Sequence, residues 1–184
     1  MSYTNSSDLY LNLSIVYPYS WIDIPVLTQF YSSSFTTTTL TTASNYYIMA
    51  LSSLNTLIST GNSDFTNNSS SYINVKYVGS NPNNRNCKFT YNFSYKIDKL
   101  NETLTFCVYK NPLFTGESIS SGTLLTNSLV LVTSPTSTSY IQNISIQIVS
   151  AITTNDTFYL CVTPTTSGAI ITPSICNIIC EINA

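Results

Sequence analysis

Charged residues are scarce in this sequence. Asp, Glu, Lys and Arg together make up 8% of the 184 residues, and the formal net charge is -2, whereas a typical soluble domain carries about 25% charged residues. Six Lys and Arg residues are too few to form a basic surface for phosphates, so we expect no nucleic-acid partner. The polar surface must come from hydroxyls and amides, of which there are 29 Ser, 27 Thr and 20 Asn. Salt and pH act on charges, so the solubility of such a surface is insensitive to both. A biased genome composition is the alternative origin of this profile.

Histidine is absent. The chain therefore lacks the commonest general base and zinc ligand, and Ser-His-Asp or Cys-His nucleophile arrangements are impossible. The eight carboxylates show no metal-ligand spacing, and the five glycines form no nucleotide-binding loop. Asp98 and Glu102 flank a predicted turn that could bind calcium, although a solvated hairpin end is the favoured interpretation. We expect no enzyme, no cofactor and no metal.

Long apolar runs are also absent. No stretch reaches the roughly 18 apolar residues that a membrane span needs, and residues 1–5 lack the features of a secretory signal. We expect a virion or extracellular-surface location. The chain would reach it by another route, or with a signal that lies outside this sequence.

Strict alternation of apolar and polar residues is the dominant pattern that is present. In residues 87–97 it places these side chains on one face: Cys87, Phe89, Tyr91, Phe93, Tyr95 and Ile97. Further candidate strands are residues 9–17, 72–78, 103–109, 140–150, 157–163 and 175–182, with residues 129–132 apolar on both faces, as in a covered strand. Turns rich in Gly, Pro and Asn separate them. The pattern predicts an all-β fold, a jelly roll or β-sandwich of about eight strands.

One segment has a different period. Between residues 46 and 59 the apolar positions recur at helical spacing: Tyr47, Leu51, Leu54, Leu57 and Ile58. Ser44 or Asn45 can cap the beginning, and Gly61 can cap the end. The spacing predicts one short helix over residues 46–59.

The first 40 residues differ in texture from the rest, since aromatic and proline residues interrupt short apolar runs. They form either an arm that packs on a neighbour or, as we favour, the first strands of one jelly-roll or β-sandwich domain that continues through residues 41–184. Tyr17, Tyr19 and Trp21 are the candidate partner contacts of this region. Packing in a core is the commoner role of such side chains.

The five cysteines match no zinc-site spacing. Cys176 and Cys180 share a face, but about 13 Å separates them along a strand, which is too far for a disulfide. Cys107 and Cys161 lie opposite the aliphatic faces of their predicted strands. If these strands are neighbours, the two cysteines can form a cross-strand disulfide. Buried free thiols are the favoured alternative.

Three Asn-x-Ser/Thr sequences fall on or beside predicted polar faces and are candidate glycosylation sites: Asn12, Asn92 and Asn143. Such sequences arise readily by chance in a chain this rich in Ser and Thr.

Residues 88–182 resemble the trimeric jelly-roll heads of the tumour-necrosis-factor and complement-globular-head type, which viral fibres and spore-surface proteins also use. The similarity lies in residues 104–111, in residues 146–152 leading into 154–160, and in the closing residues 175–182. Asn155 stands where the family motif has glycine, and the family's glycine-rich framework is largely missing. The resemblance implies trimerisation and a display role.

We therefore expect a structural protein of a virion or extracellular assembly, such as a minor capsid, penton, turret or fibre component. It would act through contacts with copies of itself, a homotrimer being favoured, and with other assembly proteins. One alternative is a glycan-binding or adhesive module. Another is a secreted pilus or filament subunit that donates a strand to its neighbour.

Overall fold

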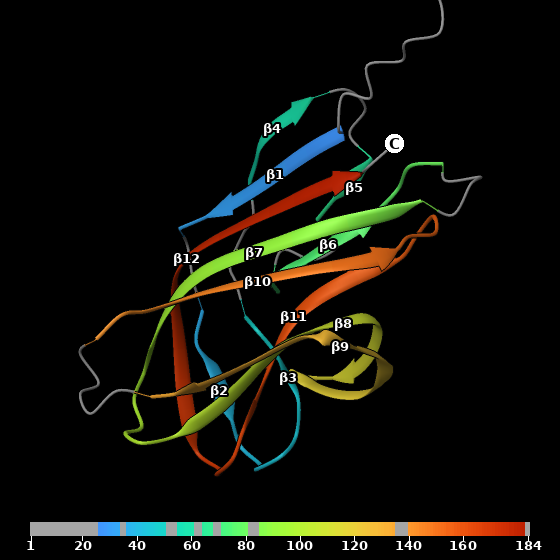
Figure 1. Cartoon of the computed structure of the whole chain (residues 1–184). Coiled ribbons are helices and arrows are strands. Elements are labelled where there is room, and N and C mark those ends of the chain that lie inside the picture. Colours follow the sequence, from blue (N-terminus) through green and yellow to red (C-terminus); the bar gives the residue numbers. More distant parts are fainter. Residues whose placement is uncertain are drawn as a thin grey trace, which may run out of the picture.

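The computed structural model describes residues 26–33, 36–50, 55–60, 64–67, 71–80, 85–134 and 140–182. Throughout these residues the regular structure is β, arranged as two antiparallel six-stranded sheets that pack face to face (Figure 1). The expected all-β sandwich is confirmed.

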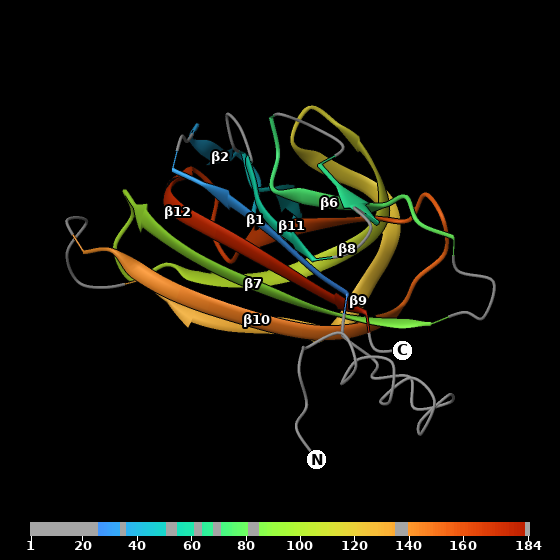
Figure 2. The same cartoon turned by 90° about the horizontal axis from the view of Figure 1, so that it is seen from above.

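Sheet A carries the strands in the order β10 (Gln142–Ala151), β7 (Asn86–Ile97), β12 (Ala169–Ile182), β1 (Val26–Ser32) and β4 (Asn55–Thr60), with β2 (Thr38–Leu40) also paired to β12. Sheet B has the order β3 (Tyr47–Ile48), β9 (Ser118–Thr133), β8 (Thr103–Thr115), β11 (Thr157–Pro164), β6 (Asn74–Tyr77) and β5 (Phe65–Thr66). The chain changes sheet at every step from β9 to β12, which is the connectivity of a jelly roll. Figure 2 shows the layers from above.

The main core lies between the sheets, and the predicted apolar face of residues 87–97 lines it. Phe89 of β7 packs on Phe158 of β11 with ring centroids 4.3 Å apart, and Phe93 packs on Phe106 of β8 at 5.0 Å. The Tyr91 hydroxyl donates a hydrogen bond to the Phe158 carbonyl at 3.3 Å. Period-2 alternation thus correctly identifies the strand that joins the two sheets.

Two further strand predictions need comment. Residues 129–132 are not covered on both faces: Val130 and Val132 pack on the core, whereas Leu129 and Leu131 are 45% and 71% exposed. That expectation was wrong because this half of β9 has only β8 beside it and nothing over its outer side. Residues 9–17 lie outside the described residues. β1 and β2, from the first 40 residues, are strands of sheet A.

The predicted helix over residues 46–59 is wrong. Tyr47–Ile48 form β3, which pairs with Val162 and Cys161 of β11, and Asn55–Thr60 form β4, which pairs with β1. Residues 51–54 are outside the described part. Strand pairing here satisfies backbone groups and buries Ile48 completely, gains that the local 3.6-residue period does not register.

Strand β3 also pairs with β9, so that β3, β9, β8 and β11 form a closed circuit, which we call the hairpin barrel. Register shifts in β8 on either side of Leu113 bend the β8–β9 hairpin back over the outer side of sheet B. Gly122, at φ 135°, faces Pro112 so closely that a Cβ would lie 2.7 Å from its Cα. The barrel encloses a second apolar cluster: Ile48, Cys107, Tyr109, Tyr159 and Cys161, with Tyr46, Tyr72, Phe114, Ile119 and Leu124 packed against it.

Two buried tyrosines of β7 should respond oppositely to loss of the hydroxyl. Tyr91→Phe removes a bond between the sheets and should lower the free energy of unfolding by about 1 kcal/mol. The Tyr95 hydroxyl is buried without a hydrogen-bond partner, so Tyr95→Phe should be neutral or stabilising. Urea denaturation of both variants checks this. A larger loss for Tyr95→Phe than for Tyr91→Phe would contradict the assignment.

Candidate functional site

The outer side of sheet A presents the longest continuous surface of uncharged polar side chains in the described residues. We call it the sheet A face. Its members are the outward residues of four strands: Asn143, Ser145, Gln147 and Val149 of β10; Lys88, Thr90, Asn92, Ser94 and Lys96 of β7; Ile175, Asn177, Ile179 and Glu181 of β12; Leu27, Gln29 and Tyr31 of β1. Its polarity follows from the same alternation that fills the core.

Strand register organises this face into rows. Ser145, Asn92 and Asn177 lie directly opposite one another across β10, β7 and β12. Neighbouring amides and hydroxyls are already hydrogen-bonded: Gln29 donates to the Asn177 amide oxygen at 2.9 Å, and the Ser94 hydroxyl donates to that of Asn143. The face is therefore partly ordered before any partner binds.

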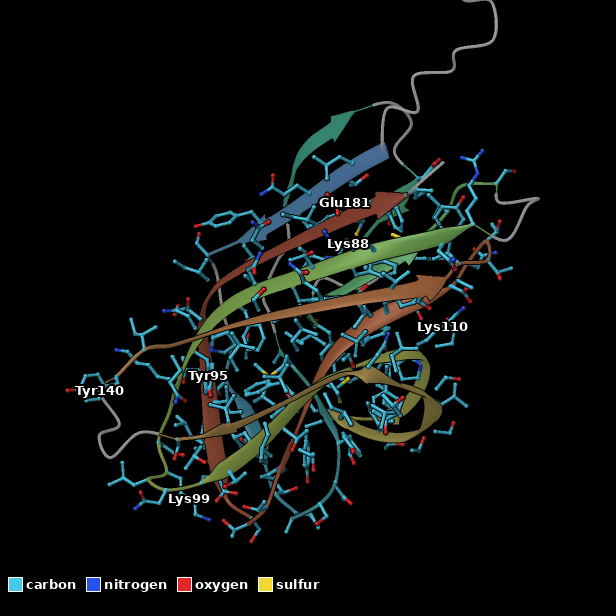
Figure 3. The ribbon with its side chains drawn as sticks, viewed as in Figure 1. Lys88, Tyr95, Lys99, Lys110, Tyr140 and Glu181 are labelled. Carbon is cyan, nitrogen blue, oxygen red and sulfur yellow. The ribbon has the colours of Figure 1, made fainter. Side chains whose placement is uncertain are left out.

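Charge is confined to the margins of the sheet A face. Lys88 and Glu181 are register partners and form an ion pair with Nζ and Oε2 3.0 Å apart (Figure 3). Lys96 is the other charged member among the described residues, and it lies next to the last residue of β7. The centre of the face can be covered without burying an unpaired charge.

A shallow hollow of about 410 Å³ lies in this uncharged centre. Its lining comes from three strands: Asn92, Phe93 and Ser94; Asn143, Ile144 and Ser145; Ile175 and Asn177. Beside it the register of β12 shifts between Pro173 and Ile175, so that Ser174 is an extra residue, and Ile175 is 47% exposed. The hollow thus combines amide groups with one exposed aliphatic side chain.

Two of the three candidate glycosylation sites lie in this hollow. Asn143 is opposite Ser94, and Asn92 is opposite Ser145, so the two asparagines are diagonal neighbours. Their glycosylation stays a prediction. Asn12 and the candidate partner contacts Tyr17, Tyr19 and Trp21 lie outside the described residues.

The structure brings Cys107 and Cys161 together as direct register partners across β8 and β11. Both are buried free thiols inside the hairpin barrel. Burial raises the pKa of the Cys107 thiol to about 12 and that of Cys161 well above its ordinary value. The other three thiols are buried in the main core. The described residues contain no group of three His, Cys, Asp or Glu side chains that could hold a metal ion.

Glu102, considered above for calcium, is instead a buried structural acid. Its Oε1 accepts bonds from the Thr165 hydroxyl at 2.9 Å and the Thr166 N–H at 2.7 Å, and its Oε2 accepts from the Thr166 hydroxyl. The Lys99 ammonium is 3.5 Å away. Burial alone would raise the pKa of Glu102, but these hydrogen bonds and Lys99 hold it below its ordinary value. The carboxylate ties the β7–β8 turn to the β11–β12 turn.

Asp156 plays the same part at the other end of the sandwich. It lies 2.6 Å from the Lys110 ammonium and accepts bonds from the Asn111 amide and the Thr153 N–H, both at 2.7 Å. Burial opposes ionisation, but these donors and Lys110 keep its pKa below the ordinary value. Both buried acids are thus fully engaged by the fold and unavailable for chemistry on a ligand.

The alternation predicted the polar side of β7 and β10, but the contribution of β12 was missed. Residues 175–182 show their alternation clearly, yet the sequence does not say that β12 lies next to β7. Asn177 and Ile175 become part of the hollow only through this pairing.

No protein-family model and no curated protein matches the sequence. Three solved structures are similar. Eiger TNF from S. frugiperda is 10% identical (87% of this chain, 93% of that chain, TM-score 0.49), and murine APRIL is 7% identical (84% and 98%, TM-score 0.46). The PRD1 vertex protein P5 is 17% identical (87% and 97%, TM-score 0.40). The predicted resemblance is confirmed. It concerns the fold alone.

Glu102 should make the fold sensitive to acid. Its folded-state pKa lies below the ordinary value of 4.5, so its contribution to stability is complete above that pH and is lost as the pH falls through the lowered value. Glu102→Gln should cost about 1–3 kcal/mol at pH 7 and flatten the decline in melting temperature below about pH 4.5. Glu117→Gln is the control, because burial raises the pKa of Glu117. An acid limb unchanged by Glu102→Gln would refute the assignment.

Proposed function

We propose that this chain is a non-enzymatic structural subunit of a virion or other extracellular assembly, which binds copies of itself through the sheet A face. The observation that carries the proposal is the uncharged centre of that face, with its one ion pair at the margin. A homotrimer is the favoured state, and other assembly proteins are expected as further partners.

The energetic argument concerns desolvation. Covering an unpaired charge costs several kcal/mol, and the cores of protein interfaces are accordingly depleted of charged residues. On the sheet A face the groups to be covered are amides and hydroxyls, which can exchange water for hydrogen bonds to a partner. Val149 and Ile175, 54% and 47% exposed, add apolar area worth about 25 cal/mol for each Å² covered.

The remaining parts of the proposal rest on what the other reactive groups do. The described carboxylates Glu102 and Asp156 serve the fold, and the five thiols are buried. Within the described residues no helix is long and apolar enough to cross a membrane. These observations support a display or assembly role more than catalysis.

A lysine in the centre of the face should disrupt self-association. Ser145 is exposed and lies in the row with Asn92 and Asn177, so Ser145→Lys would bury an unpaired ammonium in the contact. We expect the dissociation constant to rise at least about tenfold, equivalent to about 1.4 kcal/mol, as measured by light scattering over a concentration series. Thr133→Lys, on an exposed position of β9, is the matched control and should associate as the wild type does.

Two outcomes would overturn the proposal. One is a wild-type chain that stays monomeric at every concentration tested, and the other is equal association of the Ser145→Lys and wild-type proteins. Melting temperatures of both lysine variants show whether each is folded.

The hollow supports a second candidate, the binding of an uncharged glycan. Three asparagines can donate to and accept from sugar hydroxyls, and Ile175 offers an apolar contact. A monomer that binds sugars on a glycan array, and that loses binding in Asn177→Ala, would favour this function over assembly. A stable oligomer without sugar binding would exclude it.

A further inference from the structure

The hairpin barrel places two thiols opposite each other in a closed apolar interior. Cys107 comes from β8 and Cys161 from β11, and both are 0% exposed. Their strands belong to the circuit that β3 closes. The sequence alone left open whether these strands are neighbours, and the observed register settles that condition.

The backbone hydrogen bonds fix the type of this pair. In β11 the Leu160 N–H donates to the Ile73 carbonyl, and the Leu160 carbonyl accepts from the Met49 N–H, so its backbone groups point away from β8. Successive residues of a strand point their backbone groups to opposite sides, and those of Cys161 therefore point toward β8.

The partner strand shows the complementary arrangement. The Val108 N–H of β8 donates to the Ser128 hydroxyl of β9, so the backbone groups of Cys107 point toward β11. Cys107 and Cys161 are thus a hydrogen-bonded antiparallel pair, whose Cα atoms are about 5.5 Å apart. That separation lies within the range of about 4.4–6.8 Å that disulfides span.

The other three cysteines are less well placed. Cys87 is opposite Ile182, and Cys180 is opposite Phe89, which makes Cys87 and Cys180 diagonal neighbours. Diagonal positions are about 7–8 Å apart, beyond the reach of a disulfide without backbone movement. Cys176 lies four residues from Cys180 along β12 and opposite Phe93.

We propose that Cys107 and Cys161 form a disulfide when the chain folds in the presence of a small-molecule disulfide oxidant. The thiolate of one cysteine attacks the oxidant disulfide, forms a mixed disulfide and releases one thiol. The second cysteine, as thiolate, then attacks the protein sulfur of the mixed disulfide and releases the second thiol. The two cysteines lose two electrons and two protons in all, and the oxidant disulfide gains them as two thiols.

The enclosure sets when this reaction occurs. The thiols lie in a cluster with Tyr109 and Tyr159, against which Tyr46 and Phe114 pack, so an oxidant reaches them before the hairpin closes or during local opening. Burial also raises the pKa of both thiols, which suppresses the thiolates in the closed state. Once formed, the bond is equally shielded from reductants. It closes a loop containing all of β9 and β10, so it restricts the unfolded chain substantially.

This proposal does not depend on self-association. Its test is to refold the full chain from denaturant with a glutathione disulfide–glutathione couple and, in parallel, with dithiothreitol. Each sample is then denatured, alkylated and weighed as the intact protein. Oxidative refolding should leave three alkylated cysteines and peptide mapping should link Cys107 to Cys161, whereas the reduced sample should show five alkylations.

Matched variants sharpen the result. Cys87→Ser should keep the linked pair, whereas Cys161→Ser should show four alkylated cysteines in both refolding conditions. The oxidised wild type should denature at higher urea concentration than the reduced wild type, and Cys161→Ser should show no such difference. Five alkylated cysteines after oxidative refolding of the wild type, or a mapped link that includes Cys87 or Cys180, would overturn the proposal. The wild-type count decides even if a variant does not fold.

Discussion

The fold depends on the aromatic ladder of β7. Phe89, Tyr91, Phe93 and Tyr95 alternate along one side of a central strand of sheet A and interlock with Phe106 and Phe158 of sheet B. Burial of large rings contributes more per residue than any other apolar contact in such a core. Each sheet can therefore hold its strands with very few charged residues.

The same alternation determines the opposite side of the sheet. Every aromatic residue turned inward leaves a neighbour turned outward, and in β7 these neighbours are mainly Thr90, Asn92 and Ser94. Register then aligns them with the amides and hydroxyls of β10 and β12. The scarcity of charge in the composition is thus expressed as a continuous uncharged face, and this gives the composition a structural consequence that bears on assembly.

Local alternation was sufficient to predict the sandwich and most of its long strands, because period 2 is a direct property of a half-buried strand. It failed at residues 46–59, where the spacing of Tyr47 and its neighbours mimics a helix but long-range pairing prevails. The hairpin barrel could not be predicted either, since it depends on β3 meeting both β9 and β11 and on register shifts near Leu113. For the same reason the site was only half visible: Asn92 and Asn143 stood out, and Asn177 did not.

The most direct test of the sheet A face as the subunit contact is hydroxyl-radical footprinting at concentrations below and above association. Val149 and Ile175 lie on this face, whereas Leu131 is exposed on the outer side of sheet B. The account predicts that oxidation of Val149 and Ile175 falls on association while that of Leu131 is unchanged. Protection of Leu131 with continued oxidation of Val149 and Ile175 would contradict it.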